Sequence, residues 1–218
     1  MKKILATLAA VVFSTSTFAA DLSQMSIGIT GNHGLYGADG KEENYTHTGT
    51  LERTTKKDGA AFLATYASIF AEYSVNDQVS IGLSYTPEAI ETPQNVNSGE
   101  GGSDTTDIKV KAEFEELTTL YVLAKSDIGV YGKVGVSTMN IDVTSENAGT
   151  YSDPGSNNGI ELALGYEHEA ADGVSVRAEL AYHDFDDVSA NNGITDKNEI
   201  TITNMQGATA RISLVKSF

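Results

Sequence analysis

Hydrophobic and polar residues alternate with a period of two along several stretches of the chain. In the clearest of them, Val79, Ile81 and Leu83 alternate with Ser80 and Gly82. A period of two places alternate side chains on opposite faces of a β-strand. The pattern predicts eight strands, at residues 25–36, 61–73, 79–87, 107–125, 130–143, 159–169, 174–185 and 200–218.

The last of these stretches is apolar along one face and polar along the other. The apolar face carries Ala208, Ala210, Ile212, Leu214 and Phe218, and the polar face carries Thr209, Arg211, Ser213 and Ser217. Such a strand would form an exposed, association-prone edge in an open sheet. In a closed barrel it pairs with the first strand, so the edge disappears.

The connections between the predicted strands alternate between long and short. Residues 74–78, 126–129 and 170–173 are turn-sized, whereas 37–59, 88–106, 144–158 and 186–199 are long and polar. Short turns at one end and long loops at the other are typical of barrels in outer membranes. We therefore expect an all-β fold, an eight-stranded antiparallel up-and-down transmembrane β-barrel.

Two of the stretches, 60–73 and 111–125, are rich in Ala, Glu and Leu and are compatible with an amphipathic helix by local propensity. We favour strands, because the neighbouring strands need antiparallel partners.

The first twenty residues have the three-part pattern of a secretory signal peptide. Lys2 and Lys3 precede an apolar run, and small residues end at Ala20. We predict a signal peptide at 1–20 and an outer-membrane β-barrel domain at 21–218. The chain has no Cys, so its stability after export depends on burial or on a closed sheet rather than on disulfides.

Charged residues fall on the polar faces of the predicted strands. An eight-stranded barrel has an interior just wide enough for side chains, so charges that point inward must pair or stay hydrated. Lys216 is on the apolar face, close enough to the chain end for its amine to reach the membrane interface. We predict a lumenal charge network of Glu72, Lys133, Glu161, Glu167, Arg177, Glu179 and Arg211.

Aromatic residues offer a second indication of a membrane. Because the chain has no Trp, an interfacial aromatic girdle would have to consist mainly of Tyr. The alternative is that these rings pack inside a soluble β-sandwich. We predict a girdle of Tyr36, Tyr73, Tyr85, Tyr121, Tyr166 and Tyr182.

Residues 174–185, residues 130–136 and the terminal Phe218 resemble the OmpA/OmpX-type eight-stranded outer-membrane barrels and related small porin-family surface proteins. The resemblance covers the whole chain after the signal peptide. It implies location in the cell outer membrane of a Gram-negative cell, and assembly by an insertion machinery that reads Phe218 in the last strand. Ser213 and Lys216 stand where the family commonly has a glycine and an aromatic residue.

The net charge of the chain excludes one class of binding partner. Without residues 1–20 the chain has 12 Lys plus Arg against 30 Asp plus Glu, a net charge of −18. Such a surface repels nucleic acid. We expect contacts with outer-membrane lipid and lipopolysaccharide, and divalent cations at acidic loops, in a chain that acts as a monomer.

Two acidic groups could supply oxygen ligands to calcium. Their spacing does not match a calcium-binding loop, so solvated loop charge is the simpler interpretation and we expect no metal site of the protein's own. The groups are Glu100, Asp104 and Asp107, and Asp184, Asp186, Asp187, Asp196 and Glu199.

The sequence contains few candidates for catalytic residues. His183 beside Asp184 and Asp186 is the best candidate for a general base, but no Ser occurs in a nucleophile motif near it. The alternative is a polar residue near the barrel rim. We expect no catalytic residues and no cofactor.

The sequence favours a structural or surface-interaction protein with long acidic extracellular loops. A narrow channel is the first alternative, because inward glycines leave space in the lumen. A barrel-embedded hydrolase is the second. The inward glycines are Gly28, Gly82, Gly135, Gly165 and Gly207.

Overall fold

The computed structural model describes residues 22–45, 49–93, 95–97, 108–146, 152, 154–191 and 198–218. The predicted signal peptide lies outside these residues, as do Glu100, Asp104, Asp107 and Asp196. Within the described residues, no helix has the length and apolar composition needed to cross a membrane. The helix η1 (Leu22–Gln24) leads into the first strand.

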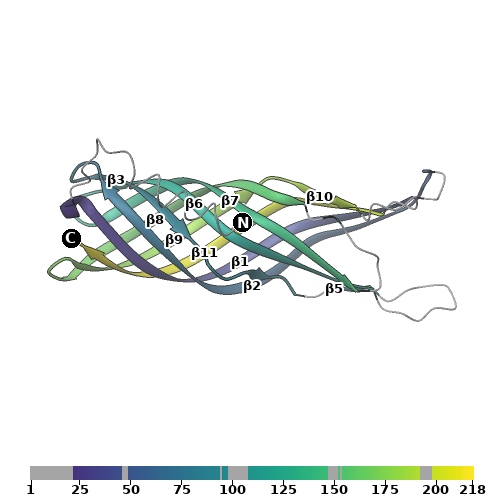
Figure 1. The fold of residues 1–218 in the computed structure, drawn as a ribbon, viewed down its shortest axis with the longest axis horizontal. Helices are drawn as coiled ribbons and strands as arrows, with labels where there is room; N and C mark the ends of the chain where they lie inside the picture. Colours follow the sequence, from purple (N-terminus) through teal and green to yellow (C-terminus); the bar gives the residue numbers. More distant parts are fainter. Residues whose placement is uncertain are drawn as a thin grey trace.

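Eight strands form one closed antiparallel ring (Figure 1). Each pairs with the next along the chain, and the first pairs with the last from Ser26 opposite Ser217 to Asn44 opposite Asn198. This confirms the predicted fold, and both ambiguous stretches are strands. The ring consists of β1 (Met25–Tyr45), β2 (Leu51–Ser74), β3 (Val79–Tyr85), β6 (Ile108–Lys125), β7 (Val130–Glu146), β8 (Gly155–Ala171), β9 (Val174–Phe185) and β11 (Asn198–Ser217).

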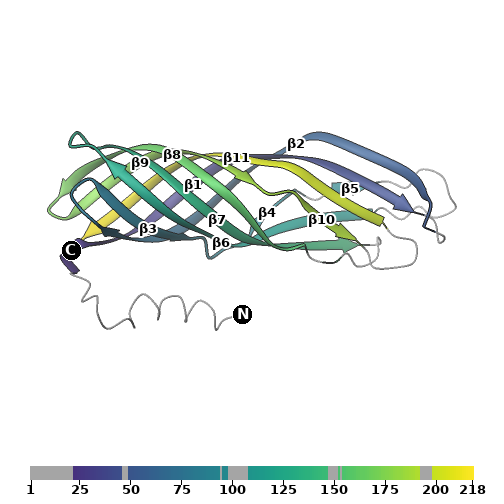
Figure 2. The same cartoon turned by 90° about the horizontal axis from the view of Figure 1, so that it is seen from above.

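The two ends of the barrel differ. The short turns 75–78, 126–129 and 172–173 lie at the end that also holds the C-terminus, which we call the turn end (Figure 1). The opposite end is the loop end. There β1 and β2 continue together past the other strands (Figure 2).

Near the turn end the barrel is apolar outside and polar inside. Large aliphatic side chains point outward and are exposed, among them Leu180 (69%), Leu164 (65%) and Ile212 (61%). Burial of one such side chain is worth roughly 1.5–3 kcal/mol, so an outward belt of them requires an apolar surrounding. The inward face holds buried polar residues such as Thr30 and Ser213, whose hydroxyls lie 2.8 Å apart.

The predicted long loops are partly wrong, because strand extends into all four. Residues 37–59 are mostly the outer parts of β1 and β2, and β7 and β8 extend into 144–158. Beyond the apolar belt both faces of a hairpin meet water or other protein, so alternation no longer marks the strands. Three short strands complete the sheet: β4 (Ile90–Glu91) and β5 (Asn95–Asn97) pair with β6, and β10 (Val188–Asn191) pairs with β11.

Bulges interrupt three of the strands at the transition to the loop end. The extra residues lie in β2 between Lys57 and Ala60, in β6 between Glu115 and Thr118, and in β11 between Thr203 and Gln206. Glu116 and Asn204 have positive φ, 55° and 53°. A bulge inserts an extra residue and changes which side chains point inward beyond it.

One seam in the wall is not closed by a strand ladder. β3 is short, and its pairing with β2 ends at Tyr85 opposite Ile69. From there the chain follows β6 instead: the Thr86 amide donates to the Leu117 carbonyl (2.9 Å), and the Thr92 amide to the Ala112 carbonyl (2.9 Å). Within the described residues, β2 from 52 to 68 therefore has a ladder partner on its β1 side alone.

Candidate functional site: the barrel lumen

The structure brings all seven predicted lumenal charges inside the barrel, together with a cation that the sequence analysis missed. Lys125, at the end of β6, lies 2.8 Å from Glu167. It could have been found by noting that it closes the β6 hairpin opposite the acidic end of β8. The described lumen thus pairs four cations with four carboxylates: Lys125, Lys133, Arg177 and Arg211 with Glu72, Glu161, Glu167 and Glu179.

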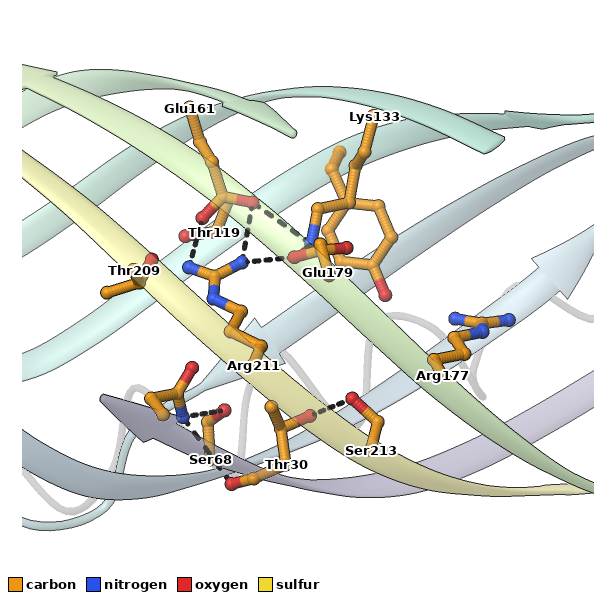
Figure 3. Close-up of polar contacts among 12 residues, drawn as sticks. Thr30, Ser68, Thr119, Lys133, Glu161, Arg177, Glu179, Thr209, Arg211 and Ser213 are labelled. Carbon is orange, nitrogen blue, oxygen red and sulfur yellow. Dashed lines mark hydrogen bonds and ion pairs between the residues drawn. The ribbon is translucent and has the colours of Figure 1, made fainter. Parts of the chain in front are cut away.

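Four of these side chains form a square of alternating charge, drawn in Figure 3. Arg211 on β11 lies 2.7 Å from Glu179 on β9 and 2.8 Å from Glu161 on β8. Lys133 on β7 contacts the same two carboxylates at 2.8 and 3.0 Å. All four side chains are 2–10% exposed, so each charge depends on its partners rather than on water.

A second group lies nearer the turn end. Arg177 donates two parallel hydrogen bonds to Glu72, at 2.6 and 2.7 Å, and a third to Glu167. Two paired N–H···O bonds fix the guanidinium in orientation as well as position. Tyr121 also donates to Glu72, at 2.8 Å, and Tyr131 donates to Glu179 in the square at 3.0 Å. The Arg177 guanidinium lies 5.5 Å from the centre of the Tyr131 ring, and the Lys133 amine lies 4.8 Å from that of Tyr121, so the two tyrosines join the groups.

Aromatic rings fill the space that four of the five inward glycines leave, and Thr119 lies against the fifth, Gly135. A Cβ on Gly28 would come within 2.2 Å of the Phe70 ring, and one on Gly165 within 2.3 Å of Tyr131. The glycines therefore make room for rings that lie across the wall, which removes the space on which the channel alternative relied. The same holds for Gly82 against Tyr121 and for Gly207 against Tyr36.

The girdle prediction is wrong for two tyrosines. Tyr36 and Tyr121 are 9% and 4% exposed and point into the lumen, where Tyr36 shares a 2.6 Å hydrogen bond with Tyr66. Position near a strand end suggested the girdle, but the direction of a side chain is set by its parity along the strand. Tyr73, Tyr85, Tyr166 and Tyr182 lie on the outward face, level with or beside exposed aliphatic residues.

His183 lies deep in the lumen rather than near the rim. It is fully buried, with Nε2 3.0 Å from the Thr209 hydroxyl and 3.1 Å from an Arg211 nitrogen. Its Nδ1 lies 3.6 Å from Glu161. Asp184, the next residue, is on the opposite face of the strand, so the predicted pairing with Asp184 and Asp186 does not form. The imidazole belongs to the charge network.

A row of neighbouring aromatic rings crosses the lumen on the loop-end side of the network. Phe185 and His183 are 5.9 Å apart with parallel planes, His183 and Tyr36 6.1 Å, and Tyr36 and Phe62 5.7 Å. Phe62 continues the row to Phe114 at 6.3 Å. We call this row, contributed by β9, β1, β2 and β6, the aromatic layer.

Beyond the aromatic layer lies a cavity of about 470 Å³, which we call the apolar cup. Most of its lining is hydrophobic, and much of that belongs to the buried cluster of the loop end. The principal lining side chains are Phe62, Phe114, Leu117, Met139, Phe185 and Met205.

The acidic loop residues do not assemble into a metal site in the part of the chain that the structure describes. No group of three or more His, Asp or Glu there could hold a metal ion. Asp187 instead accepts a hydrogen bond from the Asn204 amide at 3.2 Å.

Phe218 lies beside the first strand, with its amide 3.1 Å from the Met25 carbonyl. Lys216 is exposed, and its amine lies 3.4 Å from the Asp172 carbonyl in a turn.

Comparison with known proteins agrees with this geometry. Residues 5–204 match the family described as outer membrane protein beta-barrel domain. No curated protein matches the sequence.

Solved structures share the architecture at low sequence identity. The outer membrane protein OprG from Pseudomonas aeruginosa is 13% identical, covering 88% of this chain and 96% of OprG, with a TM-score of 0.53. Neisserial surface protein A is 12% identical over 88% of this chain and 99% of that one, with a TM-score of 0.45. Ail of Yersinia pestis is 12% identical over 83% of this chain and 98% of that one, with a TM-score of 0.36. At these identities the OprG match supports the fold alone.

Proposed function

The chain belongs to the outer membrane protein beta-barrel domain family, and we propose that this member is a non-conducting barrel with a structural and surface-interaction role. Its location in the outer membrane follows from the family and the fold. The closed lumen and the projecting hairpin support the finer role.

The observation that carries the proposal is the lack of space at the level of the charge network. The cavity among Lys133, Arg177, Glu179 and Arg211 is about 20 Å³. A single water needs roughly 10–15 Å³ measured with a water-sized probe, so this space holds about one water. A hydrated ion does not fit between side chains that hold one another by ion pairs.

The hairpin of β1 and β2 supports a role at the cell surface. It extends past the other strands at the loop end (Figures 1 and 2), which is the extracellular end in outer-membrane barrels. Residues 37–59 contain five acidic and four basic residues, whereas the stretch 88–106 has four acidic residues and no basic one. The hairpin therefore offers both signs of charge to a partner, in a chain that is otherwise strongly acidic.

The remaining features of the role are part of the same proposal. The barrel acts as a monomer without enzymatic activity, and an insertion machinery reads Phe218. Loop carboxylates such as Asp186 and Glu199 contact lipopolysaccharide through bridging divalent cations. His183 supports the non-enzymatic role, because its ring nitrogens face Thr209, Arg211 and Glu161 inside the plug.

Planar-bilayer conductance tests the plug. We expect wild-type protein to give no stable unitary currents. A variant with Lys133, Glu161, Glu179 and Arg211 all changed to Ser lacks the square and should open steps of current, with heat-dependent gel migration as the control that it still folds. Stable currents from the wild-type barrel that disappear in Arg177→Ala would overturn the proposal in favour of a narrow channel.

Thiol labelling tests the display of the hairpin. Because the chain has no Cys, Thr54→Cys provides a single thiol on the exposed part of β2. We expect a membrane-impermeant maleimide to label it on intact cells. The matched variant Asp77→Cys, in an exposed turn at the turn end, should react only after the outer membrane is permeabilised. The reverse pattern would place the hairpin on the periplasmic side and exclude a surface role.

A further inference from the structure

The apolar cup is separate from the charge network and much larger than the space within it. The apolar cup holds about 470 Å³, against about 20 Å³ at the network. An engineered apolar cavity of about 150 Å³ takes one benzene, so the cup has room for roughly three such units. Cavities of about 300–1,000 Å³ with mostly hydrophobic walls are typical of small-molecule sites.

The walls of the cup suit an uncharged ligand. Phe62, Phe114 and Phe185 offer ring faces, and Met139 and Met205 offer flexible thioethers that adapt to the shape of a ligand. Gln206 and Thr92 are among the few polar side chains at its edge. Asp39 also lines the cup, but its carboxylate already accepts hydrogen bonds from the Gly59 amide (2.7 Å) and the Asn204 side chain (2.8 Å). The charges of the network lie behind the aromatic layer, where they are paired with one another. A charged ligand would lose its hydration without gaining a partner.

The longer loop-end segments outside the described residues contain few large apolar side chains. The stretches between strands at the loop end that the structure does not describe have the sequences Thr-His-Thr at 46–48, Ser-Gly-Glu-Gly-Gly-Ser-Asp-Thr-Thr-Asp at 98–107, Asn-Ala-Gly-Thr-Tyr at 147–151 and Asn-Gly-Ile-Thr-Asp-Lys at 192–197. Tyr151 and Ile194 are their only large apolar residues. An apolar occupant from outside the chain therefore fits the site better.

The cup is closed toward the turn end and borders the seam between β2 and β4. The aromatic layer and the charge network block the way to the turn end, so the cup is a blind site rather than part of a pore. Its lining includes Ala61 and Phe62 on β2 and Ile90 on β4, which stand on either side of the seam without a strand ladder. Outward residues beside the seam, Leu63 (66% exposed) and Ile69 (51%), belong to the apolar belt. Apolar molecules near the outer edge of the membrane thus lie next to the seam that the cup borders.

From these observations we propose that the apolar cup is a binding site for a small uncharged hydrocarbon-like molecule, taken up at the loop end of the barrel. The ligand chemistry is that of an aliphatic chain or an aromatic ring system, whether it arrives as a free solute or as an acyl chain of a lipid. The inference is independent of the proposed surface role, because a blind apolar site leaves the conductance and the thiol labelling unchanged.

A single introduced tryptophan can report on the site, because the chain has none. Phe114→Trp places the reporter in the cup wall, and Tyr182→Trp places a matched reporter on the outward face. The full-length barrel in lipid nanodiscs is titrated with 1-bromonaphthalene, whose bromine quenches tryptophan on contact. We expect saturable quenching of the Phe114→Trp reporter and only a linear, non-saturable response from Tyr182→Trp.

Filling the cup should abolish that saturable response. In the Phe114→Trp background, Ala112→Phe adds a ring to the cup wall and should weaken binding by about tenfold or more, since one methylene too many in an apolar pocket costs roughly 10- to 200-fold. Ala210→Phe, the same change on the outward face of β11, should leave binding unchanged. Ala38→Phe, on β1, replaces Ala112→Phe if that variant fails to fold, as judged by heat-dependent gel migration.

Nanodiscs with brominated acyl chains separate the two sources of ligand. Quenching of the cup reporter by these lipids alone, relieved by Ala112→Phe, supports the site and assigns its occupant to the bilayer. Saturable quenching by 1-bromonaphthalene alone assigns it to free solutes. The proposal is overturned if both reporters respond linearly to 1-bromonaphthalene and the cup reporter is insensitive to Ala112→Phe.

Discussion

The two halves of the barrel have opposite polarity. Toward the turn end, aliphatic side chains such as Leu180 and Ile212 point outward, and Arg177 and Arg211 point inward. Toward the loop end, the outward positions become polar and the inward positions become apolar. Along β9 the change occurs over one residue pair: Asp184 points outward, and Phe185 points inward and is 8% exposed.

This inversion shows that each half is suited to a different solvent. The turn-end half is surrounded by hydrocarbon, so it hides its charges and pairs them. The loop-end half has a buried apolar cluster and polar outer positions, as in a water-soluble protein. The bulges at Glu116 and Asn204 lie at the transition. The same strands thus continue from lipid into water, because their outward face changes from apolar to polar and their inward face from polar to apolar.

The largest effect should come from breaking the charge network. Arg211→Ala leaves Glu161 and Glu179 with Lys133 as their remaining cation, and a buried charge without its partner costs roughly 3–5 kcal/mol. Guanidinium unfolding of the barrel in micelles measures this. Arg53→Ala, on the exposed hairpin, is the control and should change the unfolding free energy by less than about 0.5 kcal/mol. Equal effects at the two arginines would mean that the network contributes nothing specific.

Placing a charged residue on the outward face tests whether the belt of aliphatic side chains lies in hydrocarbon. Leu180→Arg puts a cation into hydrocarbon and should cost about 2–4 kcal/mol, whereas Asp184→Arg, four residues along the same face, should cost about 0–1 kcal/mol. The comparison is made by unfolding the barrel from lipid vesicles. If both changes cost the same, the two positions share one environment and the inversion of polarity is refuted.

The loop-end half should respond to loss of apolar volume inside. Met139→Ala removes part of the buried cluster and should cost about 2 kcal/mol, near the lower end for such changes because the side chain already borders a cavity. Asn158→Ala, an exposed outward position on the neighbouring strand, should stay within about 0.5 kcal/mol. Similar unfolding midpoints for Met139→Ala and wild type would show that the cluster is not a stabilising core.

In the turn-end half, the sequence alone predicted most of the side chains that point into the lumen. Around Glu161, Arg177 and Arg211 the period of two holds, so their inward positions follow from counting along β8, β9 and β11. The same counting from Ser26 places Tyr36 inward, although its position near a strand end suggested the membrane interface. Tyr121 was harder, because Leu120, Tyr121 and Val122 are all apolar and their alternation carries no information about direction.

The loop-end half could not be derived from the same rule. Phe114 and Leu117 are three residues apart, so a regular strand would point them to opposite faces, yet both line the cup. The bulge at Glu116 makes this possible, and no residue pattern marked it in advance. The aromatic layer, which joins four strands far apart in sequence, likewise depends on the register of the closed ring.

The smallest expected effect is a titration at the edge between the two halves. Asp39, on β1 between the bulges of β2 and β11 and beyond the apolar belt, accepts hydrogen bonds from the Gly59 amide (2.7 Å) and the Asn204 side chain (2.8 Å). These donors, the Gly59 amide first, lower the pKa of Asp39 below its ordinary value. A lowered pKa in the folded state means that the contact is fully stabilising above about pH 4, the unfolded value, and is lost as the pH falls through the folded pKa. The chemical shift of the Gly59 amide, followed by NMR in micelles, should therefore titrate with a midpoint below about 3.9. Asp39→Asn should remove that titration, and a midpoint above the unfolded value in the wild-type barrel would show that the bulge is not held by this carboxylate.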